Sequence, residues 1–316
     1  MRQAVLTEPR HFRVAEAPPP EVGPGEVLLK VAACGVCASE LDIYRGLAGH
    51  ASYPWEPGHE VSGVVERVGE RVTGVAAGDP VAAWVTARGY GEYLAVPARH
   101  CFPAGDLPLE LAALGEPLAC AVNAVELAGI RLGDDVVIVG AGFMGQLLLR
   151  LIQLRGPRRV IVADTRDDAL ARAAAAGATA TVNPAREPLA ETVRDLTGGA
   201  GADVGVEITG AQGALAAIGG CTRMSGTLVI AGYHQGAPRQ VPLAEWNWNA
   251  FRIANAHFRD AATILRGMRA GMRLVTSGRI SLDGLVTHRF PLATIDEAFR
   301  TAIDKPEGFV KATVTP

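Results

Sequence analysis

The sequence has little cysteine, few aromatic residues and no long apolar run. Five cysteines in 316 residues, at positions 34, 37, 101, 120 and 221, are too few and too irregularly spaced for a disulfide framework. We therefore expect reduced thiols and a cytoplasmic protein. The most apolar window, residues 136–151, is interrupted by three glycines, Gln146 and Arg150, which argues against a membrane span. The first twelve residues lack the apolar core of a secretion signal.

Lysine is also scarce, with 3 residues against 27 arginines, although the total charge is nearly balanced. Thirty basic and 33 acidic residues give a formal net charge of −3. Because the arginines are scattered, we expect neither nucleic acid nor a membrane surface as a partner. A chain that is 49% hydrophobic and 20% charged is globular. Its length exceeds one typical domain and suits an enzyme that acts on a small molecule.

The first hundred residues predict a mostly-β domain, because short apolar runs are separated there by turns such as Pro18–Pro20 and Gly23–Gly25. Near the C-terminus, a β-like run at 285–290, a helical pattern at 293–303 and a last run at 308–314 have the same character. The chain is therefore expected to return to the first domain. The strands expected in the first hundred residues are 27–32, 61–68, 80–85 and 93–96.

From residue 109 onward, Ala- and Leu-rich helical stretches alternate with apolar runs. Apolar runs buried on both faces and separated by helices are typical of a doubly wound parallel sheet. We therefore predict an α/β protein with a small catalytic domain over residues 1–113, a nucleotide-binding domain over 114–284, and a return to the first domain over 285–316. The apolar runs expected as strands of the sheet are 136–139, 160–163, 204–208 and 227–231.

The segment Gly140-Ala141-Gly142-Phe143-Met144-Gly145 follows one of these apolar runs and opens a helical pattern. In a dinucleotide site, Gly140 allows the tight turn, Gly142 lets the backbone approach a pyrophosphate, and Gly145 lets helix and strand pack closely. The free N–H groups of the helix start, which includes Phe143 and Met144, attract phosphate. In a chain with 37 glycines, such a turn can also be purely structural.

Asp164 supports the binding interpretation, because it ends the next apolar run, nineteen positions after Gly145. A carboxylate at this point can accept hydrogen bonds from an adenosine ribose. It would repel a 2′-phosphate, so NAD is expected in preference to NADP. Arg166, two positions on, works against this preference.

A set of metal-binding residue types lies in the first domain. Cys37, in the segment Cys34-Gly35-Val36-Cys37, is followed about twenty residues later by His59 and Glu60. Thiolate, imidazole and carboxylate are donors that suit Zn²⁺. A structural zinc site, however, usually needs a second CxxC pair, and none follows. From the residues alone, a buried thiol and a hydrogen-bonded histidine remain an alternative.

The whole chain resembles the zinc-dependent medium-chain dehydrogenases of the alcohol dehydrogenase superfamily. It looks closest to their polyol branch, which includes sorbitol, threonine and cyclitol dehydrogenases. The resemblance implies a GroES-like catalytic domain, a Rossmann cofactor domain and an active site in the cleft between them. The matching motifs occur in the family's order and are GVCASELDIYRG, PGHEVSGVVERVGERVTGVAAGD, GYGEYLAVP, GEPLACAVNAV, VIVGAGFMG, VIVAD and LVTHRFPLATIDEAF.

By this resemblance, Cys37 and His59 match the first two ligands of a catalytic zinc. Members of the polyol branch take the third ligand from the glutamate of an EPL motif, which matches Glu116 here. Alcohol-dehydrogenase-like members use a cysteine instead, and the nearest one, Cys120, is one position out of alignment. Glu60 matches the carboxylate behind the zinc. The four-cysteine lobe of larger members is missing between residues 85 and 93, so we expect one zinc per chain.

The implied reaction is hydride transfer between NAD and a secondary alcohol, which zinc favours as its alkoxide. Ser39 matches the family's relay hydroxyl, and Asp42 stands where many members have the relay histidine. A serine in this turn can also cap a helix, with Glu40 and Asp42 favouring the helix dipole. A polyol, cyclitol or sugar-derived alcohol is the expected substrate.

Two other functions are compatible with such a fold. One is a zinc-free reductase of the quinone or enoyl type, which would have no use for Cys37, His59 and Glu116 together. The other is a non-catalytic dinucleotide-binding protein. The resemblance also implies a homo-oligomer, a dimer or a tetramer, because the outer strand of the family's cofactor domain usually pairs across a two-fold axis.

Overall fold

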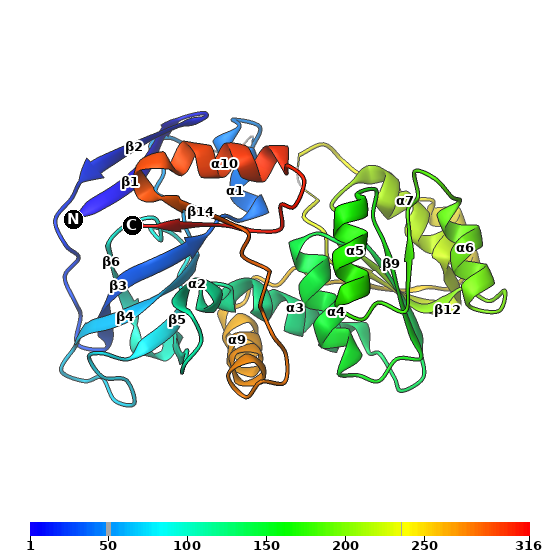
Figure 1. Cartoon of the computed structure of the whole chain (residues 1–316), viewed down its shortest axis with the longest axis horizontal. Helices are drawn as coiled ribbons and strands as arrows, with labels where there is room; N and C mark the ends of the chain where they lie inside the picture. The colour runs from blue at the N-terminus through cyan, green and yellow to red at the C-terminus, as the bar shows by residue number, and fades with distance from the viewer. Residues whose placement is uncertain (49–51, 235) are drawn as a thin grey trace. The chain divides into compact units, whose positions relative to one another are not determined.

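The computed structural model describes residues 1–48, 52–234 and 236–316 (Figure 1). The chain divides into two compact units, one of Met1–Ala119 together with Ala261–Pro316 and one of Cys120–Asp260. These limits differ from the expected segment boundaries at 113 and 284. Helix α9 (Ala261–Thr276) belongs to the first unit, where it packs against strand β7 (Cys101–Pro103).

The first unit is built on a seven-stranded sheet in the order β14-β15-β3-β4-β5-β7, with β6 paired to β3. The long central strand β3 (Glu26–Gly35) pairs antiparallel with β4, β6 and the C-terminal β15. The predicted mostly-β domain is thereby confirmed, and β14 and β15 join the C-terminal segment to its sheet. The other strands are β4 (Glu60–Val68), β5 (Pro80–Trp84), β6 (Tyr93–Pro97), β14 (His288–Pro291) and β15 (Ala312–Thr315).

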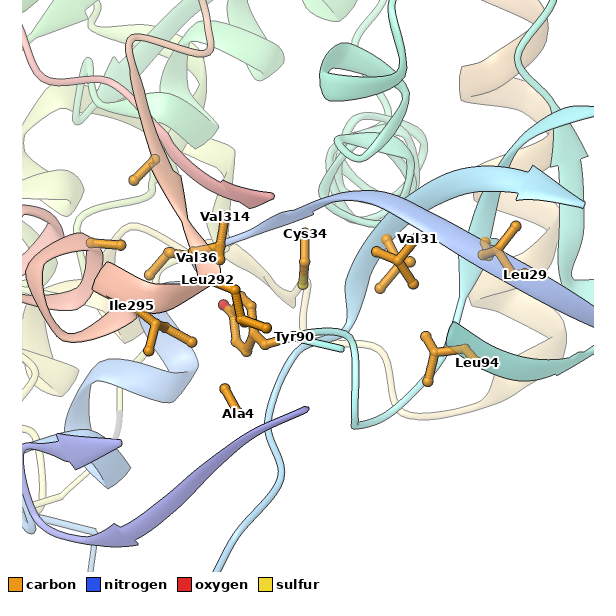
Figure 2. Packing of buried hydrophobic residues seen from close by; sticks show 14 of the residues in the cluster. Ala4, Leu29, Val31, Cys34, Val36, Tyr90, Leu94, Leu292, Ile295 and Val314 are labelled. Carbon is orange, nitrogen blue, oxygen red and sulfur yellow. The ribbon is translucent and has the colours of Figure 1, made fainter. Parts of the chain in front are cut away.

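A hairpin of β1 (Arg2–Glu8) and β2 (His11–Glu16) and two helices, α1 (Ala38–Tyr44) and α10 (Ile295–Asp304), complete this unit's core (Figure 1). Helix α10 turns an apolar stripe inward, because its buried residues recur at a spacing of three to four. Figure 2 shows part of the core, in which residues from distant segments gather in one cluster. The stripe consists of Ile295, Ala298, Phe299 and Ala302.

Phe299 is the centre of an aromatic group in this core. Its ring is fully buried and lies 4.9 Å, centroid to centroid, from both Phe12 and Tyr44. The change Phe299→Ala removes these contacts and leaves a cavity, so we expect the free energy of unfolding to fall by about 3–5 kcal/mol. Urea unfolding followed by circular dichroism measures this loss. A loss below about 1 kcal/mol would contradict the described packing.

The second unit is a six-stranded parallel sheet in the order β10-β9-β8-β11-β12-β13. Numbered along the chain, this is the order 3-2-1-4-5-6 of a doubly wound dinucleotide-binding fold, which confirms the prediction. The order reverses between β8 and β11, where such sheets bind ligands beyond their carboxyl ends. The strands are β8 (Asp135–Val139), β9 (Arg159–Ala163), β10 (Ala180–Val182), β11 (Ala202–Glu207), β12 (Thr222–Ile230) and β13 (Arg252–Asn255).

Helices connect these strands, and α3 (Gly115–Ala128) leads from the first unit into the second. Among the described residues, none of the helices has both the length and the apolar character that crossing a bilayer requires. The remaining helices are α2 (Leu109–Ala112), α4 (Phe143–Gln153), α5 (Asp167–Ala175), α6 (Leu189–Leu196), α7 (Gln212–Cys221) and α8 (Leu243–Trp248).

Candidate metal and cofactor sites

The start of helix α1 positions two of the predicted site residues. Cys37 occupies the N-cap of this helix in an extended conformation. Ser39 lies in the first turn, where its hydroxyl donates a hydrogen bond to the Cys37 sulfur at 3.2 Å. Ser39 is therefore not the helix cap, and that alternative is wrong. Asp42 lies three positions after Ser39 on the same face of α1, and its carboxylate is 3.7 Å from the Arg45 guanidinium.

His59 is held by a buried carboxylate that the sequence did not assign to the site. Oε1 of Glu40 lies 3.0 Å from His59 Nδ1 and accepts a hydrogen bond from the Gly58 N–H at 2.8 Å. The hydroxyl of Tyr90 donates to Oε2 of Glu40 at 2.7 Å. Holding Nδ1 in this way leaves Nε2 of His59 to face a metal, as carboxylate–histidine–zinc arrangements require.

Glu40 and His59 shift each other's pKa through their charges. Burial opposes ionisation of Glu40, but the charge of His59 and the surrounding hydrogen bonds outweigh it and lower the pKa of Glu40. Burial likewise opposes protonation of His59, while Cys37 and Glu40 together hold the pKa of His59 well above its usual value. Both shifts favour an ion pair, so a metal that takes His59 as a ligand must displace its proton.

This pKa shift predicts that zinc binding depends on pH. Because His59 keeps its proton to unusually high pH, the apparent zinc affinity should rise with pH until the pKa of His59 is passed. The expected slope is about tenfold per pH unit for each proton released. Competition with a chelator of known affinity between pH 6 and 8 measures this slope. A zinc affinity that does not change over this range would contradict the protonated state of His59.

Glu60 is the first residue of β4 and forms a buried ion pair. The ammonium group of Lys311 lies 2.7 Å from the Glu60 carboxylate, and both side chains are almost fully buried. Burial lowers the pKa of Lys311, but the charges of Glu60 and Cys37 outweigh this effect and raise it. Gly35 makes room for the pair, because a Cβ there would lie 2.0 Å from Oε2 of Glu60.

The structure brings Cys37, His59 and Glu60 together. One ligand atom from each lies within 4.8 Å of the others. A thiolate, an imidazole and a carboxylate in one place fit Zn²⁺ by donor chemistry. Glu116, in the first turn of α3, is not part of this group, so its role as third ligand stays a prediction.

The glycine-rich segment has the backbone that a dinucleotide site needs. Gly140 directly follows β8, begins the turn and has a φ of +118°. A Cβ on Gly145 would lie 1.9 Å from the Gly140 carbonyl oxygen, so no larger residue fits there. Around Gly142, the N-cap of α4, a Cβ would meet open space. Phe143 and Met144 form the first turn of α4, whose start is a favourable site for phosphate.

Asp164 lies directly beside this turn. Its Oδ2 accepts a hydrogen bond from the Ala141 N–H at 2.7 Å, and its Oδ1 accepts one from the Arg166 N–H at 2.9 Å. The guanidinium of Arg166 lies 3.6 Å from Asp168. The two motifs that the sequence separates by nineteen positions therefore meet at the carboxyl edge of β8 and β9.

Comparison with known proteins identifies the family. Residues 23–108 match the alcohol dehydrogenase GroES-like domain, and residues 144–269 match the zinc-binding dehydrogenase domain. The chain is 30% identical to the erythritol/L-threitol dehydrogenase of Mycolicibacterium smegmatis, over 100% of this chain and 98% of the relative. It is also 30% identical to the L-threonine 3-dehydrogenase of Pyrococcus abyssi, over 88% and 87%.

A solved structure of a zinc-binding dehydrogenase also matches the chain over its whole length. The zinc-binding dehydrogenase from Sinorhizobium meliloti, crystallised with NADP, has a TM-score of 0.87 and 26% identity over 100% of this chain and 99% of its own. Fold, motifs and relatives agree with the resemblance found in the sequence. The chain therefore belongs to the zinc-binding dehydrogenases of the alcohol dehydrogenase superfamily, a family of oxidoreductases.

Proposed function

We propose that this protein is a zinc- and NAD-dependent dehydrogenase that oxidises a secondary alcohol of a polyol, cyclitol or sugar-derived substrate. The observation that carries the proposal is the group of Cys37, His59 and Glu60, with ligand atoms within 4.8 Å of one another. A zinc-free reductase of the quinone or enoyl type has no use for such a group. The relative that acts on erythritol and L-threitol supports a polyol as substrate.

In this proposal Cys37, His59 and Glu116 hold one catalytic zinc, which when bound supplies a Lewis acid for the substrate oxygen. The chain's own residues prepare the site. Glu40 fixes the ring of His59, and Lys311 forms an ion pair with the Glu60 carboxylate.

Proton release from the substrate is assigned to helix α1. Ser39 lies beside the Cys37 sulfur, and its hydroxyl can take the substrate proton while passing its own onward. Asp42, on the same helix face and partly exposed, is the next acceptor toward water. NAD, which the glycine turn and Asp164 would hold, would supply the hydride acceptor for the substrate carbon.

We infer that NAD is the cofactor because of Asp164. Its carboxylate lies against the glycine turn, where it can bind an adenosine ribose and repel a 2′-phosphate. Because the Sinorhizobium meliloti relative was crystallised with NADP, the preference of this chain for NAD over NADP has to be measured. We place the protein in the cytoplasm, in keeping with its five cysteines, which are thiols rather than disulfides.

A homo-oligomer, either a dimer or a tetramer, is part of the same proposal. Strand β13 is an edge of the parallel sheet, and apolar side chains are exposed on and beside it. Ile253 of this strand is 47% exposed and Trp248 of α8 is 80% exposed. A sheet edge with exposed apolar side chains favours strand pairing with a second copy of this chain.

The proposed reaction can be tested with a substrate panel. Erythritol, L-threitol, L-threonine, sorbitol and inositols are offered with NAD and with NADP, and reduced cofactor is followed at 340 nm. We expect NAD-linked oxidation of one or more of these alcohols. Reduction of quinones or enones, with no alcohol oxidised by either cofactor, would assign the chain to the zinc-free reductases instead.

A further inference from the structure

A fully buried carboxylate lies at the carboxyl edge of the parallel sheet, outside the motifs described above. Glu207 is the last residue of β11 and is fully buried. The strand register places it beside Val139 of β8 on one side and Ile230 of β12 on the other. It therefore lies next to the strand that leads into Gly140, at the point where the strand order reverses.

Glu207 joins the two loops that follow β11 and β12. Its Oε1 accepts hydrogen bonds from the N–H and hydroxyl of Thr209, at 2.6 and 2.5 Å, and from the N–H of Gly210, at 3.0 Å. Its Oε2 lies 2.6 Å from Nε2 of His234. Nδ1 of His234 accepts a hydrogen bond from Nε of Arg239 at 3.4 Å, which leaves Nε2 of His234 as the donor to Glu207.

The two loops contact each other so closely that each has a glycine at the point of contact. Gly210 has a φ of +73°, and a Cβ there would lie 2.5 Å from the carbonyl oxygen of Tyr233. A Cβ on Gly232 would lie 2.4 Å from the Gly210 nitrogen. The side chain of His234 is only 12% exposed, so it belongs to this packed layer rather than to the surface.

The position of the Glu207–His234 pair in the sheet indicates which half of the cofactor would bind beside it. In a sheet of this order the two halves bind the two nucleotides of a dinucleotide, with the crevice at the reversal of strand order. Asp164 and the glycine turn belong to the half built by β8, β9 and β10. The loops clamped by Glu207 and His234 belong to the other half, which receives the nicotinamide nucleotide.

We propose that the Glu207–His234 hydrogen bond positions the loops at residues 208–210 and 231–234 for the nicotinamide half of the cofactor. This inference rests on the proposed dinucleotide function. His234 is a positioning residue: it acts through the loop backbone by holding it in the conformation that binds. Without this hydrogen bond the loops must be ordered when the cofactor binds, which weakens binding of the nicotinamide half alone.

The test compares two ligands on the full-length protein. NADH contains the nicotinamide, whereas ADP-ribose carries the adenosine half without it. His234→Phe removes the donor and keeps a ring, so we expect the Kd for NADH to rise about tenfold while the Kd for ADP-ribose stays within about twofold. His234→Gln, whose amide can donate to Glu207, should recover most of the NADH affinity. Calorimetric titration measures these Kd values for the wild type, His234→Phe and His234→Gln.

Each outcome decides between the alternatives. If His234→Phe weakens both ligands equally, or neither, the positioning role is overturned. If the wild type binds neither NADH nor ADP-ribose, the proposed NAD function fails instead. Should His234→Phe not fold, Thr209→Val removes one donor to Oε1 of Glu207, and the same selective loss of NADH affinity, about threefold, is expected.

Discussion

Replacing Cys37 by alanine is expected to remove bound zinc and to lower kcat/KM by about a thousandfold or more, while the Kd for NADH stays within about twofold. Cys37 supplies the thiolate of the group that it forms with His59 and Glu60, and without it only His59 and Glu116 remain of the proposed zinc ligands. A catalytic zinc has only three protein ligands, so two remaining ligands hold it poorly. The glycine turn and Asp164 are untouched, so cofactor binding should survive.

Zinc content by mass spectrometry, steady-state rates and a fluorescence titration with NADH measure the three quantities. Cys101→Ala is the matched control, because burial raises the pKa of Cys101 to about 12 and its thiol stays neutral. The control should keep its zinc and its rate. Full activity in Cys37→Ala would refute the zinc mechanism.

The second large effect is expected from Asp164. Asp164→Ala should lower kcat/KM with NAD about thirtyfold and leave kcat/KM with NADP equal or higher, so that the preference for NAD is lost. Two losses combine in this change. The carboxylate that can bind the ribose is removed, and so is the acceptor that holds the Ala141 N–H at 2.7 Å. Bound zinc should be unchanged.

Asp164→Asn separates these two losses. The amide oxygen can still accept from Ala141, but the charge that repels a 2′-phosphate is gone. We expect this variant to keep more activity with NAD than Asp164→Ala while still shifting toward NADP. Rates with both cofactors at matched alcohol concentration give the ratio. An unchanged NAD-to-NADP ratio in both variants would contradict the role of Asp164.

Local patterns made much of the fold predictable. The apolar runs at 136–139 and 160–163 predict β8 and β9 to within a residue, because strands buried on both faces leave continuous apolar stretches. The hairpin strand Arg2–Glu8 could not be found in this way. Four of its seven residues are polar, so its apolar run is only three residues long.

The unit to which α9 belongs could not be read from the sequence either. Its amphipathic pattern predicts a helix with a buried face but not the core that covers it. The structure places Met268 of this helix against Gly115, where an added Cβ would lie 2.8 Å from the Met268 methyl group. That contact joins residues far apart in the chain and belongs to the first unit.

In the site, too, some residues could be predicted from short motifs, whereas the roles of others depend on contacts between distant segments. Cys37, His59 and Asp164 belong to short motifs and could be predicted. Glu40 lies in one of these motifs, but its role depends on Tyr90, 50 positions away. Lys311 meets Glu60 across 251 positions. Only the folded sheet, in which β15 lies beside β3 and β3 beside β4, brings that pair together.

The most direct test of the central claim is the zinc content of the purified protein, measured together with NAD-linked alcohol oxidation before and after chelation. The account predicts about one zinc per chain, loss of activity when a chelator removes it, and recovery when zinc is added back. Full alcohol oxidation by protein that contains no metal would contradict it and reduce Cys37 and His59 to packing residues.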